Sequence, residues 1–477
     1  MTGTYATATA MLADLAAKRV SARELLDAHL ARQDRLHPKL NAVVETDIAR
    51  ALKDAQAIDA ARAKGKALGA LAGLPMTIKD GFDVENMPAT AGAPGFAHRA
   101  RDCDDATMVS RARASGAVIW GKTNVPFMLG DFQSYNDIYG TTNNPYDTTR
   151  VPGGSSGGAA AALAAGITPL EIGSDIGGSL RHPANFCGVC SLKPTWGVLP
   201  MRGHIPPPPQ AYYECDLGVV GPMARNVEDL RLLWRVLRGP RDEAPRKHAK
   251  DARIAVWDED ANFPAASAVR AGVRRAAEAL AEQGAQVETV ASPLDTARLL
   301  QVYRWLIAPI LGAGFPPEHL AKMEATRDAD IKAMQANPDP WSPEFNRVAW
   351  TARYYELAPI YAERQALKDR FARVFETYDA ILMPVSPVTA FPHDHSPSFI
   401  GRTLGMDGAT ISYMSMLTWI APATALHSPA LAFRASATAQ GLPIGVQLVG
   451  SEHGEDRLFD LAAAAEEVLG GFVPPAL

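Results

Sequence analysis

Short, strongly apolar stretches that alternate with helix-forming stretches are the feature that most limits the fold of this chain. AVIW at 117–120, RIAVW at 253–257 and AILMPVSPV at 380–388 are typical of strands buried on both faces. After the second of these comes an Ala/Arg/Glu-rich stretch at 266–283, typical of a helix, and then a further strand, QVETV, at 286–290. This alternation predicts an α/β architecture, in which helices cover a β-sheet.

The composition is that of a soluble globular protein. The 477 residues are 47% hydrophobic and 21% charged, with a net charge of −5, so the basic field of a nucleic-acid-binding protein is missing. Four cysteines in so long a chain are too few for a disulfide scaffold. The N-terminus lacks a secretory pattern and no apolar run reaches membrane-spanning length, so we expect a cytoplasmic protein without nucleic-acid or membrane partners.

Three stretches carry residues suited to chemistry, and the first is GGSSGG at 153–158, ahead of an alanine-rich helix. Glycines at a helix start expose N–H groups, but the lysine of a phosphate-binding loop is missing. Gly153, Ser155 and Gly157 also match the G-x-S-x-G nucleophile pattern, although turn-forming residues precede them where that pattern requires a strand. A flexible loop with a capped helix remains the plain alternative.

The second stretch is SDIGGSLR at 174–181. Two glycines before Ser179 let the backbone turn sharply and direct consecutive N–H groups toward one point, as an oxyanion hole requires. A serine at that position can attack the carbonyl that those donors hold. The pattern therefore favours Ser179 as a nucleophile.

The third stretch supplies a base for such a serine. None of the 11 histidines lies in a motif that nominates it, whereas Lys79 follows the apolar LPMTI. An exposed lysine has a pKa near 10.4, but burial disfavours the charged form and can lower the value to about 7–8. Taken alone, Lys79 favours the plainer interpretation of a strand that ends in a solvated charge.

Taken together, these stretches resemble the amidase signature family. The resemblance extends to LPMTIKDG, GKTN at 121–124, FCGVCSLKPTWG at 186–197, GPMAR at 221–225 and GLPIGVQLVG at 441–450, in the family's order. It implies a large mixed twisted sheet flanked by helices on both faces, and a single amidase domain over 1–477. Within it we expect a helical region at 1–65, the catalytic motifs at 66–240, a helical insertion near the pocket at 296–376, and strands and a helix that complete the sheet at 377–477.

The resemblance also implies the roles of individual residues. Ser179 is similar to the family's nucleophile, Ser155 to its bridging serine, which a cis peptide bond holds, and Lys79 to its base. The N–H groups of Ile176, Gly177, Gly178 and Ser179 are expected to form the oxyanion hole. Gly154, Ser156 and Asp175 are expected to support the loops. No metal or cofactor is implied.

The substrate is left to segments that fit the family core poorly: 203–216, 310–347 and 395–418. As loops around a pocket mouth they should set specificity. Together with Phe127 and Met128 after GKTN, Tyr213 in the first of them suggests a pocket for a small apolar or aryl amide, with carbamates and esters as further substrates, as in an aryl acylamidase or a urethanase. Core packing is an equal alternative for Phe127 and Met128. A homodimer is one option for the assembly.

Two other functions stay open. The family includes amidotransferase subunits that act on aminoacyl-tRNA, but the acidic balance here weighs against that role. A non-catalytic binding member of the fold is disfavoured by the intact Lys79, Ser155 and Ser179. Cys187 and Cys190 form a single C-x-x-C within a family motif, which we interpret as structural rather than as a zinc or redox site.

Overall fold

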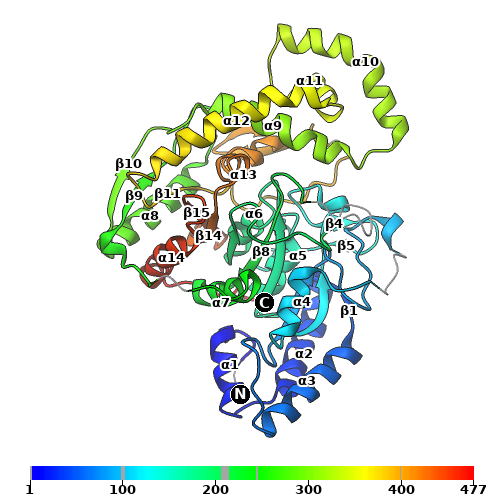
Figure 1. The fold of residues 1–477 in the computed structure, drawn as a ribbon, viewed down its shortest axis with the longest axis vertical. Coiled ribbons are helices and arrows are strands. Elements are labelled where there is room, and N and C mark those ends of the chain that lie inside the picture. The colour runs from blue at the N-terminus through cyan, green and yellow to red at the C-terminus, as the bar shows by residue number, and fades with distance from the viewer. Residues whose placement is uncertain (1–2, 98–102, 206–213, 243–244, 398) are drawn as a thin grey trace.

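The computed structural model describes residues 3–97, 103–205, 214–242, 245–397 and 399–477. Within these residues, eleven strands form one sheet in the order β1-β3-β2-β6-β8-β7-β14-β15-β11-β9-β10 (Figure 1). In that order the strands are Val43–Thr46, Val118–Thr123, Pro75–Lys79, Leu170–Asp175, Val219–Ala224, Cys190–Lys193, Ala430–Ala437, Pro443–Val449, Ala380–Pro384, Arg253–Val256 and Gln286–Thr289.

The sheet is mixed. Strands β3, β2 and β6 run parallel, as do β11, β9 and β10, whereas the strands between β6 and β11 pair antiparallel. Two small antiparallel sheets lie outside it: β4 (Tyr135–Asn136) with β5 (Gly140–Thr141), and β12 (Thr403–Met406) with β13 (Ala409–Ser412). The predicted α/β class with a large mixed sheet is confirmed.

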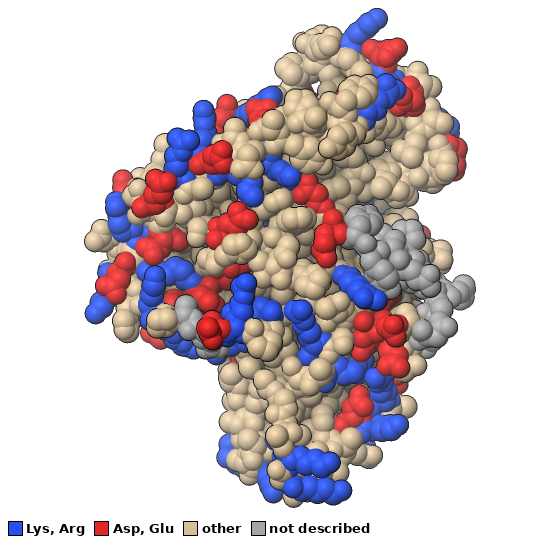
Figure 2. All heavy atoms as spheres, viewed as in Figure 1, with Lys and Arg blue, Asp and Glu red and all other residues tan. Residues whose placement is uncertain are grey.

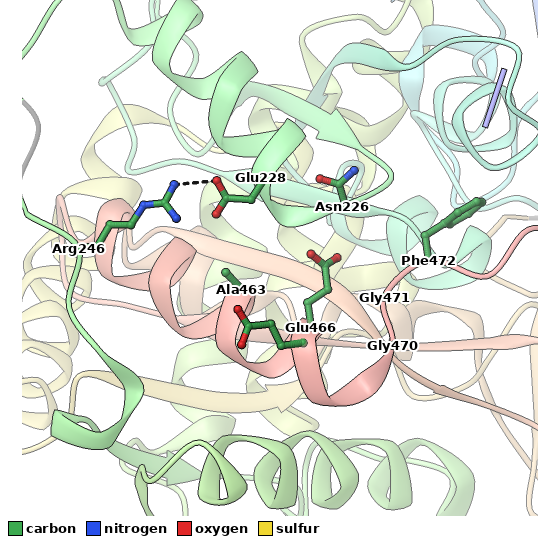
Figure 3. Close-up of a pocket in the computed structure, with 9 residues that line it drawn as sticks. Asn226, Glu228, Arg246, Ala463, Glu466, Gly470, Gly471 and Phe472 are labelled. Atoms are coloured by element: carbon green, nitrogen blue, oxygen red, sulfur yellow. Dashed lines mark hydrogen bonds and ion pairs between the residues drawn. The ribbon is translucent and has the colours of Figure 1, made fainter. Parts of the chain in front are cut away.

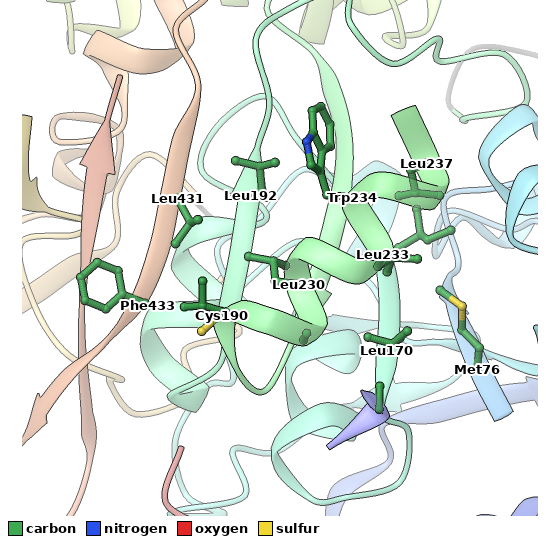
Figure 4. Packing of buried hydrophobic residues seen from close by; sticks show 14 of the residues in the cluster. Met76, Leu170, Cys190, Leu192, Leu230, Leu233, Trp234, Leu237, Leu431 and Phe433 are labelled. Carbon is green, nitrogen blue, oxygen red and sulfur yellow. The ribbon is translucent and has the colours of Figure 1, made fainter. Parts of the chain in front are cut away.

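Helices cover both faces of this sheet, because its central strands bury side chains alternately on either side. In β8, Val220 and Ala224 join one hydrophobic core, whereas Met223 joins another. The first core packs against α7 (Figure 4), α8 and α14, which are Val227–Arg238, Ser267–Glu282 and Glu455–Leu469. The second core lies under α5 and α6, which are Gly157–Ala164 and Arg181–Cys187.

The remaining helices extend the fold at its two ends (Figure 1). Near the β1 edge lie α1, α2, α3 and α4, which are Ala8–Ala16, Ala22–Leu40, Ile48–Ala63 and Thr107–Ala114. At the other end lie α9, α10, α11, α12 and α13, which are Thr296–Gly312, Pro317–Ala336, Pro343–Trp350, Tyr354–Val374 and Ala421–Ala425. Short 3-10 helices cover Pro94–Phe96, Phe127–Leu129, Ala249–Asp251 and Tyr413–Leu417.

Local sequence explains two helices directly. At the start of α2 the Ser21 Oγ accepts the Glu24 N–H at 3.1 Å, and the Glu24 carboxylate accepts the Ser21 N–H at 2.9 Å, which together form a capping box. Helix α5 consists of glycine, alanine and leucine only, and every residue in it is buried. Since none of its side chains is polar, it can cross the interior of the molecule without an unmet hydrogen bond.

The alternation of side chains in β2 determines where its last residue points. Met76 and Ile78 belong to the same hydrophobic core as α7. Thr77 and Lys79 therefore face the opposite side of the sheet, where α5 begins. Lys79, which has no exposed surface, thus lies on the face of the sheet that α5 covers.

No helix among the described residues is long and apolar enough to cross a membrane. On the face in Figure 2, lysine and arginine side chains are interspersed with aspartate and glutamate side chains.

Helix α7 offers a test of the packing. Leu233 has no exposed surface, and replacing it with alanine should lower the free energy of unfolding by about 2–5 kcal/mol, through lost contacts and a cavity. Urea unfolding followed by circular dichroism measures this. Leu68→Ala is the matched control, because Leu68 is 37% exposed and its truncation should cost less than about 0.5 kcal/mol. Equal losses in the two variants would contradict the assigned core.

Candidate active site

The amine of Lys79 lies at the C-terminal end of β2 and contacts two hydroxyl groups. Its Nζ lies 2.8 Å from the Ser155 Oγ and 2.9 Å from the Ser174 Oγ. Burial lowers the pKa of Lys79 to about 7, although the charges of Asp175 and Glu171 oppose this. Near neutral pH the amine is therefore neutral in a substantial fraction of molecules and can accept a proton.

Ser155 lies in the turn that precedes α5. The Gly154–Ser155 peptide bond is cis, which confirms the expectation from the family resemblance. The Ser134 hydroxyl fixes this turn on both sides, because it donates to the Gly153 carbonyl at 3.1 Å and accepts the Gly157 N–H at 3.1 Å. The Ser156 Oγ contacts the Ser174 carbonyl at 3.4 Å.

Ser179 lies in the loop between β6 and α6 and is 6% exposed. The Ser156 N–H donates to the Ser179 carbonyl at 3.2 Å, which joins this loop to the turn that carries Ser155. Gly178 has φ +91°, and a Cβ at this position would overlap the His182 ring. A glycine is therefore required immediately before the serine.

Asp175 organises the Ser179 loop. Its carboxylate accepts the N–H groups of Gly178 at 2.9 Å and Leu180 at 3.1 Å, and it forms a bidentate pair with Arg181 at 3.0 and 2.9 Å. Burial alone would raise the pKa of Asp175, but the charge and hydrogen bonds of Arg181, the Lys193 charge and the Leu180 N–H together outweigh burial and hold the pKa well below its ordinary value. The carboxylate is therefore ionised and anchors the loop.

This anchoring alters the expected set of oxyanion donors. Because the Gly178 N–H already donates to Asp175, it is not directed at a substrate in this geometry. The N–H groups of Ile176, Gly177 and Ser179 remain as candidates. The Tyr303 hydroxyl on α9 donates to the Ile176 carbonyl at 2.8 Å and so orients the first peptide unit of the loop.

The residues expected to bind substrate are less closely tied to this geometry. Phe127 is 60% exposed and Met128 is half-buried, both in the 3-10 helix that precedes the loop at 130–134. Tyr213 lies outside the described residues. Leu129, from the same 3-10 helix, lies beside Gly81, which is two residues beyond Lys79, and the His204 ring also lies beside Gly81.

Four residues of this arrangement were not predicted from the sequence. Ser174 is part of the SDIGGS motif and directly precedes Asp175, so its place in that motif could have suggested a role at the site. Ser134, Tyr303 and His204 carry no local signal, because each meets the site through contacts with residues distant in the sequence. Burial, together with the charge of Lys79, lowers the pKa of His204 to about 3, so its imidazole is neutral.

The Cys187 and Cys190 thiols are both free and buried. Burial raises the pKa of each above the ordinary thiol value, so neither is a reactive thiolate at neutral pH.

A separate hollow of about 710 Å³ lies between the start of α7 and the end of α14 (Figure 3). Its acidic groups serve the fold: Glu466 accepts the Val227 N–H at 3.1 Å, and Glu228 pairs with Arg246 at 2.7 Å. None of the residues that line it belongs to the serine loops.

Comparison with known proteins agrees with the geometry. The amidase family model matches residues 24–459. The chain belongs to the amidase family. Among curated relatives, a glutamyl-tRNA(Gln) amidotransferase subunit of Cyanothece sp. is 32% identical, over 95% of this chain and 96% of the relative. The corresponding protein of Salinispora tropica is 33% identical over the full length of both chains.

Solved structures share the fold over nearly the whole chain. A structure described as an amidase has a TM-score of 0.79 at 27% identity, and covers 98% of this chain and 100% of that one. The 6-aminohexanoate cyclic dimer hydrolase has a TM-score of 0.78 at 25% identity, with 98% of each chain covered. A bacterial aryl acylamidase of the amidase signature family, at 22% identity and a TM-score of 0.79, covers 97% of this chain and 96% of that one and shows the fold alone.

The pKa of Lys79 leads to a pH dependence. Lys79 can act as the expected base only as a neutral amine, so kcat/KM should rise with pH, about tenfold per unit below pH 7, and level off above it. Initial rates between about pH 5 and 9 measure this limb, with buffer and Ser179→Ala as blanks. Lys79→Arg keeps the positive charge but cannot be deprotonated, so it should lose activity over the whole range. A flat wild-type profile down to pH 5 would exclude Lys79 as the base.

Proposed function

We propose that this protein hydrolyses a carbon–nitrogen amide bond through an acyl-enzyme on Ser179. The observation that carries the proposal is the contact between the buried Lys79 amine and the Ser155 hydroxyl, on a turn hydrogen-bonded to the Ser179 loop. A serine needs a base to become a nucleophile, and a lysine whose pKa is about 7 can act as one.

The steps follow from this arrangement. Lys79 takes the Ser155 hydroxyl proton while Ser155 takes that of Ser179, and the Ser179 Oγ attacks the amide carbonyl carbon. The N–H groups of Ile176, Gly177 and Ser179 receive the developing oxyanion, where each donor is typically worth about 3–4 kcal/mol. The proton then returns through Ser155 to the leaving nitrogen, and the amine departs. Water attacks the acyl-enzyme by the same proton route and releases the acid.

The substrate that fits best is a small apolar or aryl amide, with carbamates and esters as further substrates. Two buried arginines near the serine loops are already paired, Arg181 with Asp175 and Arg402 with Asp131. Neither is available to a carboxylate substrate. The neighbouring side chains of Leu417, beside Gly177, and Leu129, beside Gly81, are apolar. Phe127, Met128 and Tyr213 are proposed to complete the pocket.

The alternative is an amidotransferase subunit, which the names of the relatives in Cyanothece and Salinispora favour. Such a protein would release ammonia from the side-chain amide of glutamine, which carries a free carboxylate. A cytoplasmic location and a homodimer stay predictions.

A labelling experiment tests the mechanism. A fluorophosphonate should form a covalent adduct on Ser179 that mass spectrometry of the tryptic peptide locates. Ser179→Ala should lose the adduct and reduce kcat by about 10⁵–10⁶-fold, because the nucleophile, its bridge and its base act as a unit. Failure of the folded wild-type protein to form the adduct would contradict the acyl-enzyme mechanism.

A substrate panel then separates the two functions. Release of aniline from acetanilide, or of nitrophenol from an aryl carbamate, with no ammonia from glutamine, is the expected result. The opposite result, ammonia from glutamine and no product from the aryl compounds, would favour the amidotransferase role.

A further inference from the structure

One short segment, Asp131–Tyr135, supports the turn that carries Ser155. A Cβ added to Gly154 would overlap the carbonyl oxygens of Asp131 and Gln133, and would lie 2.7 Å from the Gln133 nitrogen. The cis peptide bond therefore rests directly on the backbone of this segment. Ser134, from the same segment, holds the turn on both sides through its hydroxyl.

The same segment reaches the Ser179 loop. The Phe132 ring lies 5.5 Å from the His182 ring, edge to face at 79°. His182 in turn lies against Gly178, and its backbone N–H donates to the Gly178 carbonyl at 2.7 Å. A shift of the segment would thus move both serine loops relative to Lys79.

A buried ion pair fixes the segment to the C-terminal part of the chain. The Arg402 Nη1 lies 2.6 Å from the Asp131 Oδ2, with side chains only 3% and 9% exposed. The Tyr413 hydroxyl donates to the other carboxylate oxygen at 2.6 Å, and the Arg402 Nη2 donates to the Tyr135 hydroxyl at 2.8 Å. These contacts occupy both oxygens of Asp131.

A second pair of contacts also fixes this segment to the C-terminal part of the chain. The Gln133 side-chain amide donates to the Asp394 carbonyl at 2.7 Å and accepts the Asp394 N–H at 2.9 Å. Arg402 and Tyr413 directly flank the β12–β13 hairpin, and Asp394 precedes it in the chain. The region around the hairpin is thus joined to the Asp131–Tyr135 segment by a contact between residues 261 positions apart, and this segment in turn supports the turn that carries Ser155.

A buried ion pair is a poor source of net stability, because the loss of hydration offsets most of the attraction between the charges. Such a pair does, however, provide a directional hydrogen bond that holds two side chains at fixed positions. We propose that Asp131 and Arg402 form a latch that holds Ser155 in line between Lys79 and Ser179. They are positioning residues, and the proposal rests on the proposed acyl-enzyme function.

Arg402→Met and Asp131→Asn test the latch. Each should lower kcat at least about tenfold with KM changed less than about twofold, because the reacting groups lose their alignment while the pocket is retained. The rate of fluorophosphonate labelling of Ser179 should fall in parallel. The double variant should lose no more than the worse single variant, since both remove one interaction. Arg402→Lys, which keeps the charge, should recover part of the rate.

Arg231→Met is the matched control. Arg231 also forms an ion pair, with Asp460 at 3.0 Å and side chains 5% and 8% exposed, and its guanidinium lies over the Phe459 ring. It joins α7 to α14 on the other face of the sheet. This variant should leave kcat and the labelling rate unchanged, even where its melting temperature falls as much as that of Arg402→Met.

Activities are compared per folded molecule, measured by circular dichroism at the assay temperature. If Arg402→Met does not fold, Tyr413→Phe replaces it, because it removes only the hydroxyl bonded to Asp131. The latch is overturned if the wild type is labelled and these variants are labelled at the same rate, or if KM alone rises. If the wild type itself is not labelled, the proposed function fails and the latch fails with it.

Discussion

The site depends on keeping one amine out of water. A hydrated lysine stays charged near neutral pH and has no lone pair to offer a serine. In this fold the alternation of side chains in β2 places Lys79 on the face of the sheet that the wholly apolar helix α5 covers. The amine then meets the hydroxyls of Ser155 and Ser174, and burial lowers its pKa to about 7. A sheet covered on both faces thus provides the burial that the proposed chemistry requires.

A second constraint follows from the first, because any unpaired carboxylate nearby would restore the charge on Lys79. Asp175 is one carboxylate near Lys79, but Arg181 pairs with it through two hydrogen bonds. Glu171 is the other, and burial raises its pKa to about 8, so it is largely protonated at neutral pH. The strand that leads to Ser179 therefore brings two acids close to Lys79, one paired and one neutral. Burial is therefore the largest influence on the proton affinity of the amine, and it outweighs the opposing effect of the two acids.

The architecture could be predicted from the sequence, and two of the residues selected as reacting groups, Lys79 and Ser155, lie in contact, but most supporting contacts could not be predicted. Buried strands, the capping box of α2 and the glycine–serine turns are local patterns, so their structures follow from neighbouring residues. The Gly178 N–H was expected in the oxyanion hole but bonds to Asp175, a competition that spacing alone does not reveal. Tyr303, Ser134 and Arg402 act across 127, 19 to 23 and 271 positions. Such contacts depend on the order of the strands in the sheet, which no short sequence motif encodes.

The strand order also has a consequence for how the molecule is made. Strand β7, which ends at Lys193, pairs on its outer side with β14, which begins at Ala430. During synthesis, more than two hundred further residues must therefore be added after β7 before β14 can cover the exposed edge of β7. An uncovered strand edge invites pairing with other chains, and contacts so distant in sequence form slowly. The nascent protein is thus expected to depend on protection from aggregation until β14 and β15 leave the ribosome and join the two halves of the sheet.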